Sequence, residues 1–313
     1  MERSRVAIIG AGQVGATVAH LVMLKELADV VLIDVVDGLA QGKGLDLLQA
    51  AAIEDLPVRV SGTTDFATLA GSRIVVITAG LARKPGMSRD DLLAANANIV
   101  GPIAERIAKE APEAIVLVVT NPLDIMTALV LQRSGFPRSR VIGMAGVLDT
   151  GRLRACIAQR LNVSPADVQA MILGSHGELM VPLASSLTVK GTPLAQLLDA
   201  NTIEQLLTRA RDGGAEIVSL LKTSSAYYAP ASGVVQMMGA ILRDEHRILP
   251  GCAWLQGEYG LQDVCIGVPV ELAAAGLVRV VEQPLTPQER AALHAAAEQV
   301  RSGIAQVCSP VKT

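Results

Sequence analysis

The first half of this 313-residue chain alternates short apolar runs with longer segments of helical pattern. The runs are rich in β-branched residues and apolar throughout, which is typical of strands covered on both faces in a parallel sheet. The segments between them are long enough to form the crossover helices that parallel strands require. This order predicts an α/β fold built on a Rossmann doubly wound parallel sheet. The expected strands are residues 5–10, 29–35, 58–62, 73–80, 114–120 and 140–144.

The second half of the chain, from about Val147, mixes helical and strand patterns. It contains no internal repeat, and no long polar linker separates it from the first half. We therefore predict a dinucleotide-binding Rossmann domain over residues 1–146 and a mixed α+β substrate domain over residues 147–313, with a cleft between them. The expected helices are residues 147–161, 203–222 and 286–307, and the expected strands are residues 168–175, 181–189 and 263–272.

The segment "VAIIGAGQVG" places three glycines as G-x-G-x-x-G between an expected strand and an expected helix. In this motif the first glycine permits a tight turn, the second lets a pyrophosphate approach the backbone, and the third lets helix and strand pack closely. The helix N-terminus adds N–H groups and a positive dipole. We predict that a dinucleotide binds here, and the alternative is a turn of purely structural use. The predicted cofactor-binding residues are Gly10, Ala11, Gly12, Gln13, Val14 and Gly15.

An acidic residue ends the next expected strand, "VVLID". Asp34 lies about 20 residues beyond the Gly-rich turn, where the dinucleotide motif requires an acid that binds both ribose hydroxyls. A carboxylate there would repel the 2′-phosphate of NADP. The predicted cofactor is therefore NAD.

Three polar residues of the second half are candidates for catalysis. His176 lies between two glycines in "LGSHGELMVP", and a single histidine in such a place can also be structural. Asp149 and Arg152 are three residues apart at the start of an expected helix, so both can project to one side of a cleft. They could serve as a helix cap and its salt-bridge partner. The functional interpretation is that Asp149 orients the imidazole of His176 while Arg152 binds a substrate carboxylate.

Together with further motifs, these residues resemble the lactate/malate dehydrogenase family over essentially the whole chain. Within that family the likeness is greatest to the malate dehydrogenases of lactate-dehydrogenase-like type. The resemblance implies reversible, NAD-dependent oxidation of (S)-malate to oxaloacetate by hydride transfer. The motifs follow the family's order and spacing: "GAGQVG", "LIDVVDGLAQGKGLDL", "RKPGMSRDDLLAANANIV", "VTNPLD", "GVLDTGRLR", "SHGELMVPL" and "SSAYYAP".

The resemblance implies a role for the polar residues of the catalytic motifs. His176 is expected to accept the substrate proton, with Asp149 as its orienting partner. Arg152 is expected to bind the carboxylate next to the reacting carbon, and Arg89 to polarise the reacting oxygen.

The resemblance also implies contacts around this centre. Asn121 is expected to touch both the substrate and the nicotinamide, Asn96 and Val119 to lie at the cofactor, and Ser225 to border the substrate pocket. One departure is visible, because many relatives carry Asp after the His-Gly pair and this chain has Glu178. The change alters the surroundings of the site without removing a predicted catalytic group.

The basic loop "GLARKPGMSRDDL", residues 80–92, is expected to decide the substrate. In the resemblance Arg83 occupies the position that pairs with a second carboxylate, where lactate dehydrogenases typically carry glutamine. Leaving a buried charge without its partner costs roughly 3–5 kcal/mol. At about 1.4 kcal/mol per decade, this predicts a preference for oxaloacetate over pyruvate of two to three or more orders of magnitude. Gly80 and the pair Pro85–Gly86 are the expected hinge and turn for loop closure, and an ordinary surface turn is the alternative.

Charge and composition point away from polyanionic and membrane partners. The net charge is −3 and the pI about 5.9, so no basic field suggests nucleic acid or an anionic membrane. The first residues show no signal-peptide design, and no apolar run is long enough to span a bilayer. These features predict a soluble, cytoplasmic protein, and the resemblance implies a homodimer or homotetramer.

Neither the cysteines nor the histidines suggest a metal site. The cysteines form no C-x-x-C pair, and the histidines form no H-x-x-x-H or H-E-x-x-H pattern. We expect no metal and no disulfide framework. The residues concerned are Cys156, Cys252, Cys265, Cys308, His20, His176, His246 and His294.

Two other functions remain open at this point. One is a dehydrogenase for a monocarboxylate such as lactate, which Arg83 disfavours. The other is a non-catalytic NAD-binding protein, which would not need the four predicted catalytic and substrate residues together. A short-chain dehydrogenase is disfavoured because Tyr227 and Tyr228 are followed four residues later by Ala231 and Ser232 instead of lysine.

Overall fold

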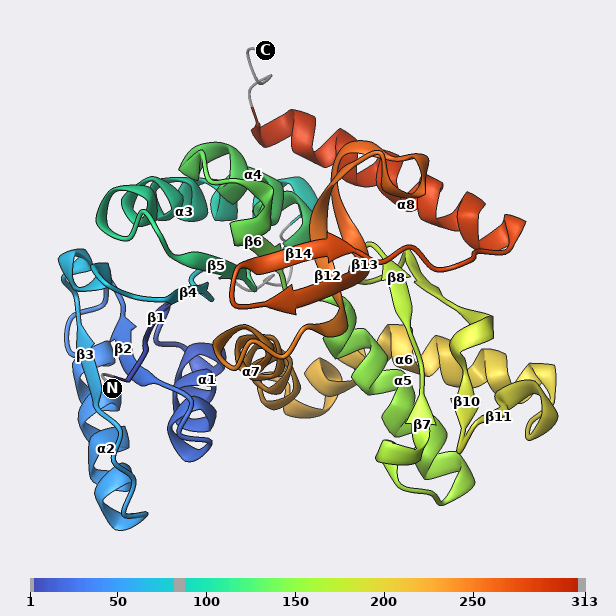
Figure 1. Ribbon diagram of the computed structural model, residues 1–313, viewed down its shortest axis with the longest axis horizontal. Helices are drawn as coiled ribbons and strands as arrows, with labels where there is room; N and C mark the ends of the chain where they lie inside the picture. The colour runs from blue at the N-terminus through green and yellow to red at the C-terminus, as the bar shows by residue number, and fades with distance from the viewer. Residues whose placement is uncertain (1–2, 82–87, 309–313) are drawn as a thin grey trace.

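The computed structural model describes residues 3–81 and 88–308 (Figure 1). Its N-terminal half is a parallel sheet with the strand order β3-β2-β1-β4-β5-β6. This order confirms the predicted doubly wound sheet. The strands are β1 (Arg5–Ile9), β2 (Asp29–Ile33), β3 (Val60–Thr63), β4 (Ile74–Ile77), β5 (Ile115–Val118) and β6 (Val141–Gly143).

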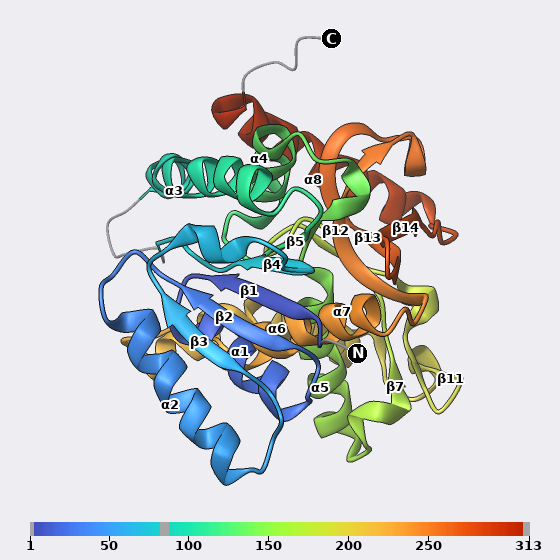
Figure 2. The same ribbon diagram turned by 60° about the vertical axis from the view of Figure 1, so that its left-hand side comes forward.

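Both faces of this sheet are buried, which explains the unbroken apolar runs. In β1, Val6 and Ile8 belong to one apolar core, and Ala7 and Ile9 belong to the core on the opposite face. Figure 2 shows α1 and α2 on one side of the sheet and α3 and α4 on the other. These helices are α1 (Gln13–Leu24), α2 (Leu39–Ile53), α3 (Arg89–Glu110) and α4 (Leu123–Ser134).

The sheet continues beyond β6 into the second half of the chain. Cys252 of β12 is paired antiparallel with Gly143 of β6, and the order then runs β12-β13-β8-β9. The domain boundary predicted between residues 146 and 147 stays a prediction. The sheet contains strands from both sides of this boundary. The added strands are β8 (Ile172–Gly174), β9 (Met180–Pro182), β12 (Arg247–Gln256), β13 (Gln262–Ala273) and β14 (Gly276–Val280), which pairs with β13.

Four helices and a small second sheet complete the second half (Figure 1). The predicted helices correspond to α5, α6 and α8 within three residues at each end. In Figure 1, α8 crosses the upper side of the molecule near β13, while α5 and α6 lie below. The elements are α5 (Gly146–Leu161), α6 (Ala200–Leu221), α7 (Tyr228–Leu242) and α8 (Pro287–Val307), with β7 (Val168–Gln169), β10 (Thr188–Val189) and β11 (Thr192–Pro193).

Four strands and α-helices of the second half were not predicted, and two have a clear physical reason. The helix α7 is buried over most of its surface, so its sequence lacks the polar face that marks an amphipathic helix. The strand β12 contains Pro250 and Gly251, a pair that ordinarily indicates a turn. Both residues are nevertheless paired with β13, opposite Pro269 and Val268. The other two are β14 and β11, which are short strands at the edges of their sheets.

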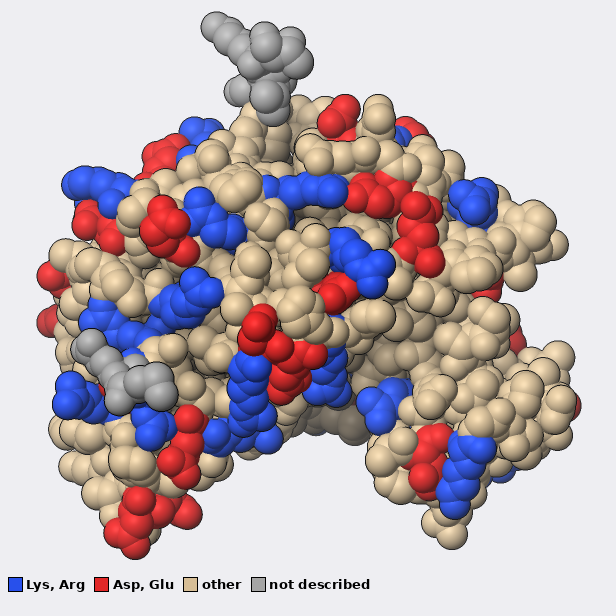
Figure 3. All heavy atoms as spheres, viewed as in Figure 1, with Lys and Arg blue, Asp and Glu red and all other residues tan. Residues whose placement is uncertain are grey.

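The face of the molecule in Figure 3 carries basic and acidic side chains side by side. It is hollowed at its lower edge, between the part that carries α1 and α2 and the part that carries α5 and α6. Within residues 3–81 and 88–308, no helix has both the length and the apolar character that crossing a bilayer requires. In the same residues, no cluster of three or more His, Cys, Asp or Glu side chains is arranged to hold a metal ion.

Candidate active site

The Gly-rich turn joins β1 to α1 with the geometry that its glycines predict. Gly10 has a φ of +104°, in the left-handed region that favours glycine. A Cβ on Gly15 would lie 1.9 Å from the carbonyl oxygen of Gly10, so only glycine allows this approach of helix to strand. A Cβ on Gly12 would meet nothing within 4 Å, and Gly12 is the N-cap of α1. The turn therefore leaves open space directly before the helix N-terminus.

Asp34 is tied to this turn by hydrogen bonds. Its Oδ2 accepts from the backbone N–H of Ala11 at 2.7 Å, and its Oδ1 accepts from that of Val36 at 3.0 Å. Lys43 donates from Nζ to the carbonyl of Ala11 at 2.8 Å. Asp34 is half-buried at the end of β2, with its carboxylate held beside the open turn.

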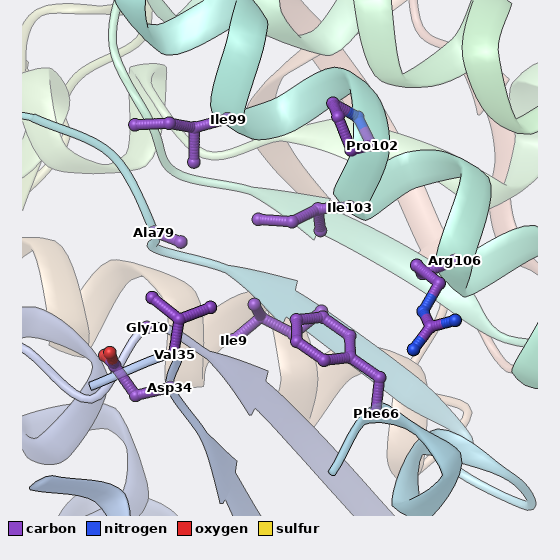
Figure 4. Close-up of a pocket in the computed structure, with 10 residues that line it drawn as sticks. All are labelled: Ile9, Gly10, Asp34, Val35, Phe66, Ala79, Ile99, Pro102, Ile103 and Arg106. Carbon is purple, nitrogen blue, oxygen red and sulfur yellow. The ribbon is translucent and has the colours of Figure 1, made fainter. Parts of the chain in front are cut away.

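A hollow of about 410 Å³ adjoins Asp34 and is lined mostly by apolar side chains (Figure 4). In Figure 4, Val35 lies on one side of it with Asp34, and Ile99 and Ile103 of α3 lie on the other. The Phe66 ring lies within the same hollow. Its shape and apolar lining suit a flat base such as adenine, and the acid beside it suits a ribose. The hollow and the open turn together fit the dinucleotide that the sequence predicts.

Most residues of this hollow were missed by the sequence-based prediction, which named only Gly10 and Asp34 among them. The others come from segments far apart in the chain, so no local spacing marks them. The sequence offered one signal, an apolar residue directly after the cofactor acid: Val35, which the structure shows to be 80% exposed. Arg106 lies with its guanidinium 5.7 Å from the centroid of the Phe66 ring. The missed residues are Ile9, Val35, Phe66, Ala79, Ile99, Pro102, Ile103 and Arg106.

His176 and Asp149 form a close pair although 27 positions separate them in the chain. Nδ1 of His176 lies 2.9 Å from Oδ2 of Asp149, and the side chains are 18% and 4% exposed. Nη1 of Arg152 lies 3.4 Å from the other carboxylate oxygen of Asp149. Because Ala145 is the N-cap of α5, Asp149 does not cap the helix. The salt bridge to Arg152 exists, and it accompanies the histidine contact.

The environment raises the pKa of His176 above its ordinary value. Burial lowers this pKa, because it disfavours the cation. Attraction to Asp149, the hydrogen bond between the two side chains and a smaller attraction to Asp124 outweigh burial and the repulsion from Arg152. The imidazole can therefore carry a proton at higher pH than an isolated histidine. Such a group suits reversible proton transfer near neutral pH.

A cleft of about 510 Å³ opens beside His176. Arg89, at the start of α3, and the exposed Asn121 both line it. The guanidinium of Arg89 forms an ion pair with Glu178, and the two side chains are 60% and 74% exposed. One wall comes from α8, which the sequence-based prediction did not include. The residues contributed by α8 are Gln299, Val300, Ser302, Gly303 and Gln306.

Two predicted cofactor residues lie close to this cleft. Asn96 is fully buried, and its Nδ2 donates to the carbonyl of Leu81 at 3.1 Å and to that of Asn121 at 2.6 Å. Its Oδ1 accepts from the N–H of Leu81 at 2.7 Å. Asn96 thus braces the start of the basic loop against the segment that presents Asn121. Val119 is half-buried directly after β5.

The remaining predicted substrate residues do not line the His176 cleft. Arg152 lines a separate hollow of about 810 Å³ between α1, α5 and α7, and its buried Nε has no hydrogen-bond partner among residues 3–81 and 88–308. Ser225 is exposed, shortly before α7. Arg83 and the pair Pro85–Gly86 lie outside the described residues. The structure therefore brings Arg89 and Asn121 to the His176 cleft, and places Arg152 next to His176 through the Asp149 carboxylate that both side chains contact.

Comparison with known proteins identifies the family. The lactate/malate dehydrogenase NAD-binding domain matches residues 4–143, and the lactate/malate dehydrogenase α/β C-terminal domain matches residues 146–310. The chain belongs to the lactate/malate dehydrogenase family. Membership confirms the predicted NAD cofactor and the predicted NAD-dependent oxidoreductase activity.

Relatives in this family are similar over nearly their whole length. A malate dehydrogenase of Nostoc punctiforme is 55% identical over 96% of this chain and 92% of its own. One of Roseiflexus castenholzii is 51% identical over 97% of this chain and 98% of its own.

Solved structures of the family show the same fold with either of two substrates. The malate dehydrogenase of Cryptosporidium parvum has a TM-score of 0.95 at 39% identity, covering 97% of this chain and 99% of its own. The lactate dehydrogenase of the same organism, complexed with lactic acid and NAD, also has a TM-score of 0.95, at 37% identity, covering 99% of this chain and 100% of its own. The backbone fold therefore does not distinguish malate from lactate.

Proposed function

We propose that this family member oxidises (S)-malate to oxaloacetate with NAD⁺, and catalyses the reverse reaction, with His176 as the group that exchanges the substrate proton. The observation that carries the chemistry is the pair of His176 and Asp149, 2.9 Å apart beside a cleft that Asn121 also lines. The choice of malate is supported by relatives at about half identity that are malate dehydrogenases.

The proposed mechanism divides the work between the two halves of the chain. The Gly-rich turn and Asp34 would hold NAD⁺, which would supply the hydride acceptor. Nδ1 of His176 is tied to Asp149, so Nε2 is the nitrogen that takes the C2 hydroxyl proton. Asp149 keeps the Nδ1–H tautomer in place and stabilises the imidazolium that forms.

Two arginines complete this proposal. Arg89 stabilises negative charge on the reacting oxygen, and must first exchange its ion pair with Glu178 for the substrate. Arg152 binds the C1 carboxylate. Its buried Nε, which has no hydrogen-bond partner among the described residues, is a donor available for this contact. Both roles rest on the family resemblance and on these local environments.

Arg83 is the proposed determinant of substrate choice, because its guanidinium would pair with the C4 carboxylate of the dianion. The test compares oxaloacetate and pyruvate as oxidants of NADH, for the unaltered protein and for Arg83→Gln. We expect kcat/KM for oxaloacetate to exceed that for pyruvate by about two to three orders of magnitude or more, and the variant to lose most of this difference.

Lys84→Gln is the matched control for the same loop, since we expect Lys84 to be solvated and its loss to leave the preference intact. NADPH should replace NADH poorly because of Asp34. Equal use of both oxo acids by the unaltered protein would argue for a lactate-type enzyme. Unchanged selectivity between the two oxo acids in Arg83→Gln would show that Arg83 does not determine substrate choice.

A cytoplasmic homo-oligomer, dimer or tetramer, remains part of the proposal. Two helices support it, since apolar side chains are exposed on α2 and at the C-terminal end of α6. Analytical ultracentrifugation would decide the state, and a monomer at micromolar concentration would oppose the proposal. The exposed residues are Leu45, Leu48 and Ile53 on α2 and Val218, Leu220 and Leu221 on α6.

A further inference from the structure

A second buried carboxylate lies beneath His176, in addition to Asp149. Asp124, in the first turn of α4, is 3% exposed. Its Oδ2 accepts from the hydroxyl of Ser175 at 2.8 Å and from the backbone N–H of His176 at 3.1 Å. The proposed proton transfer does not use this carboxylate, so its position requires an explanation of its own.

The turn that carries His176 needs an external support. It runs between Gly174 and Gly177, whose φ angles of +87° and +113° lie in the left-handed region. Glycines give a backbone many accessible conformations, so a turn flanked by them does not hold a side chain in place by itself. Asp149 contacts the imidazole ring, whereas Asp124 contacts the main chain at the same residue. The two carboxylates thus fix different parts of His176 from different helices.

Asp124 also links this turn to the cofactor side of the cleft. It follows Asn121 by three residues, at the start of the helix that the Asn121 segment leads into. Asn121, Asp124 and His176 line the same cleft. The hydrogen bonds that Asp124 accepts from the His176 turn therefore join the two parts of the molecule proposed to meet the nicotinamide and the substrate hydroxyl.

We propose that Asp124 is a positioning residue of the dehydrogenase reaction, which anchors the main chain of His176 to the Asn121 segment and so sets the distance between proton acceptor and hydride acceptor. This inference rests on the proposed function. A displacement of about 1 Å at a reacting group can cost about 100-fold in rate, which makes such an anchor consequential.

The charge of Asp124 adds a second effect. Burial raises the pKa of Asp124, and hydrogen bonds from Ser175, the Cys252 thiol and the His176 backbone oppose this. The positive end of the α4 dipole also favours the anion.

The charged groups around His176 come from three helices and its own turn. Among the described residues they are, besides Asp124, the side chains of Asp149, Arg152, Arg89, Asp90 and Glu178. Among them Asp124 raises the pKa of His176 by attraction, so removing its charge moves the titration of His176 to lower pH.

Two variants separate the hydrogen bonds that Asp124 accepts from the effect of its negative charge. Asp124→Ala removes both, whereas Asp124→Asn keeps an oxygen that can accept the two hydrogen bonds and removes only the charge. We expect kcat for oxaloacetate reduction to fall about 100-fold in Asp124→Ala and about 3- to 10-fold in Asp124→Asn. The Kd for NADH, measured by its fluorescence, should stay within about threefold in both, because Asp124 does not line the hollow at Asp34. Asp199→Asn is the matched control, since Asp199 also accepts a backbone and a hydroxyl hydrogen bond, at the N-terminus of α6.

The second readout is the NMR titration of the His176 ring, assigned by its absence in His176→Asn. The chain has only four histidines, so the assignment is direct. We expect the His176 midpoint to move to lower pH in both Asp124 variants. Should Asp124→Ala not fold, Asp124→Asn and Ser175→Ala decide the question by the same titration and by kcat.

The possible results lead to different conclusions. Folded Asp124 variants that keep kcat within twofold and an unchanged His176 titration would overturn the inference. A loss of thermal stability with normal kcat and normal titration would also overturn it, because Asp124 would then be only structural. If the unaltered protein reduces no oxaloacetate, or His176→Asn keeps normal turnover, the proposed function fails first, and that failure is separate from any result on Asp124.

Discussion

The reactivity of His176 depends on the groups that surround it in space. The acidic neighbour at Nδ1 raises its pKa and fixes its tautomer, so that Nε2 faces away from Asp149. The same Asp149 carboxylate binds Arg152, and so it couples the proton-exchanging residue to the proposed carboxylate clamp. A change at Asp149 should therefore affect both proton transfer and substrate affinity.

Asp149→Asn tests this environment at a single residue. Loss of the anion removes the main attraction that raises the pKa of His176, so the protonated form should disappear at lower pH than in the unaltered protein. Oxaloacetate reduction needs protonated His176, so its kcat/KM should begin to fall at lower pH. Malate oxidation needs the neutral form, so its acid limb should also move to lower pH. We expect kcat to drop by about two to four orders of magnitude.

The measurement is a pH profile of kcat/KM in both directions, with Asp199→Asn as a control that should behave like the unaltered protein. An Asp149→Asn protein whose pH profiles of kcat/KM stay unshifted in both directions would contradict the assigned role of Asp149 in raising the pKa of His176.

At the scale of elements, the unit formed by β1, the Gly-rich turn and α1 serves stability and binding through different glycines. Gly15 allows α1 to approach the carbonyl of Gly10, whereas Gly12 leaves space in front of the helix. The backbone of Gly12 has a φ of −67°, which other residues adopt without strain. The same substitution, glycine to alanine, can therefore test stability at Gly15 and cofactor binding at Gly12 separately.

Gly15→Ala and Gly12→Ala form this matched pair. The new Cβ in Gly15→Ala would lie 1.9 Å from the carbonyl oxygen of Gly10, so α1 would have to move away from β1. We expect the free energy of unfolding to fall by about 1–3 kcal/mol. Gly12→Ala should lose only a few tenths of a kcal/mol, because its Cβ meets open space.

Urea unfolding and NADH titration measure both effects. We expect NADH to bind at least about tenfold more weakly to Gly12→Ala, where the added methyl group occupies the space proposed for the pyrophosphate. Normal NADH affinity in Gly12→Ala would place the pyrophosphate elsewhere.

At the scale of the whole molecule, one sheet runs through both halves of the chain. The antiparallel pairing of β6 with β12 extends the parallel sheet into the second half. The largest apolar core also contains residues from both halves, from Val6 to Val300. Neither half can therefore unfold without exposing part of a core that the other half needs.

This continuity predicts a single cooperative transition in differential scanning calorimetry. Saturating NADH should raise the Tm of the whole protein, because ligand binds only the folded state. Two resolved transitions, with NADH raising only one, would show instead that residues 1–146 and 147–313 unfold independently.

The Rossmann half could be predicted from the sequence because the evidence for its strands and for its Gly-rich turn is local. Apolar runs buried on both faces, the spacing of Gly10, Gly12 and Gly15, and the acid at Asp34 each depend on sterics or burial within a few residues. His176 and Asp149 were predicted on another ground, the resemblance of the motifs that carry them to those of the family. The strand β12 was not predicted, because the pair Pro250–Gly251 usually indicates a turn. In the structure both residues are instead paired with β13.

The tertiary structure alone decided which distant residues share a site. Phe66 and Arg106 at the proposed adenine hollow, the α8 wall of the His176 cleft, and Asp124 beneath His176 come from segments with no common spacing. The contact of both His176 and Arg152 with Asp149 is likewise a result of tertiary packing, because the turn that carries His176 lies far from α5 in the chain. Local patterns specify an element, whereas proximity across the chain depends on how whole elements pack, and no short stretch of sequence contains that information.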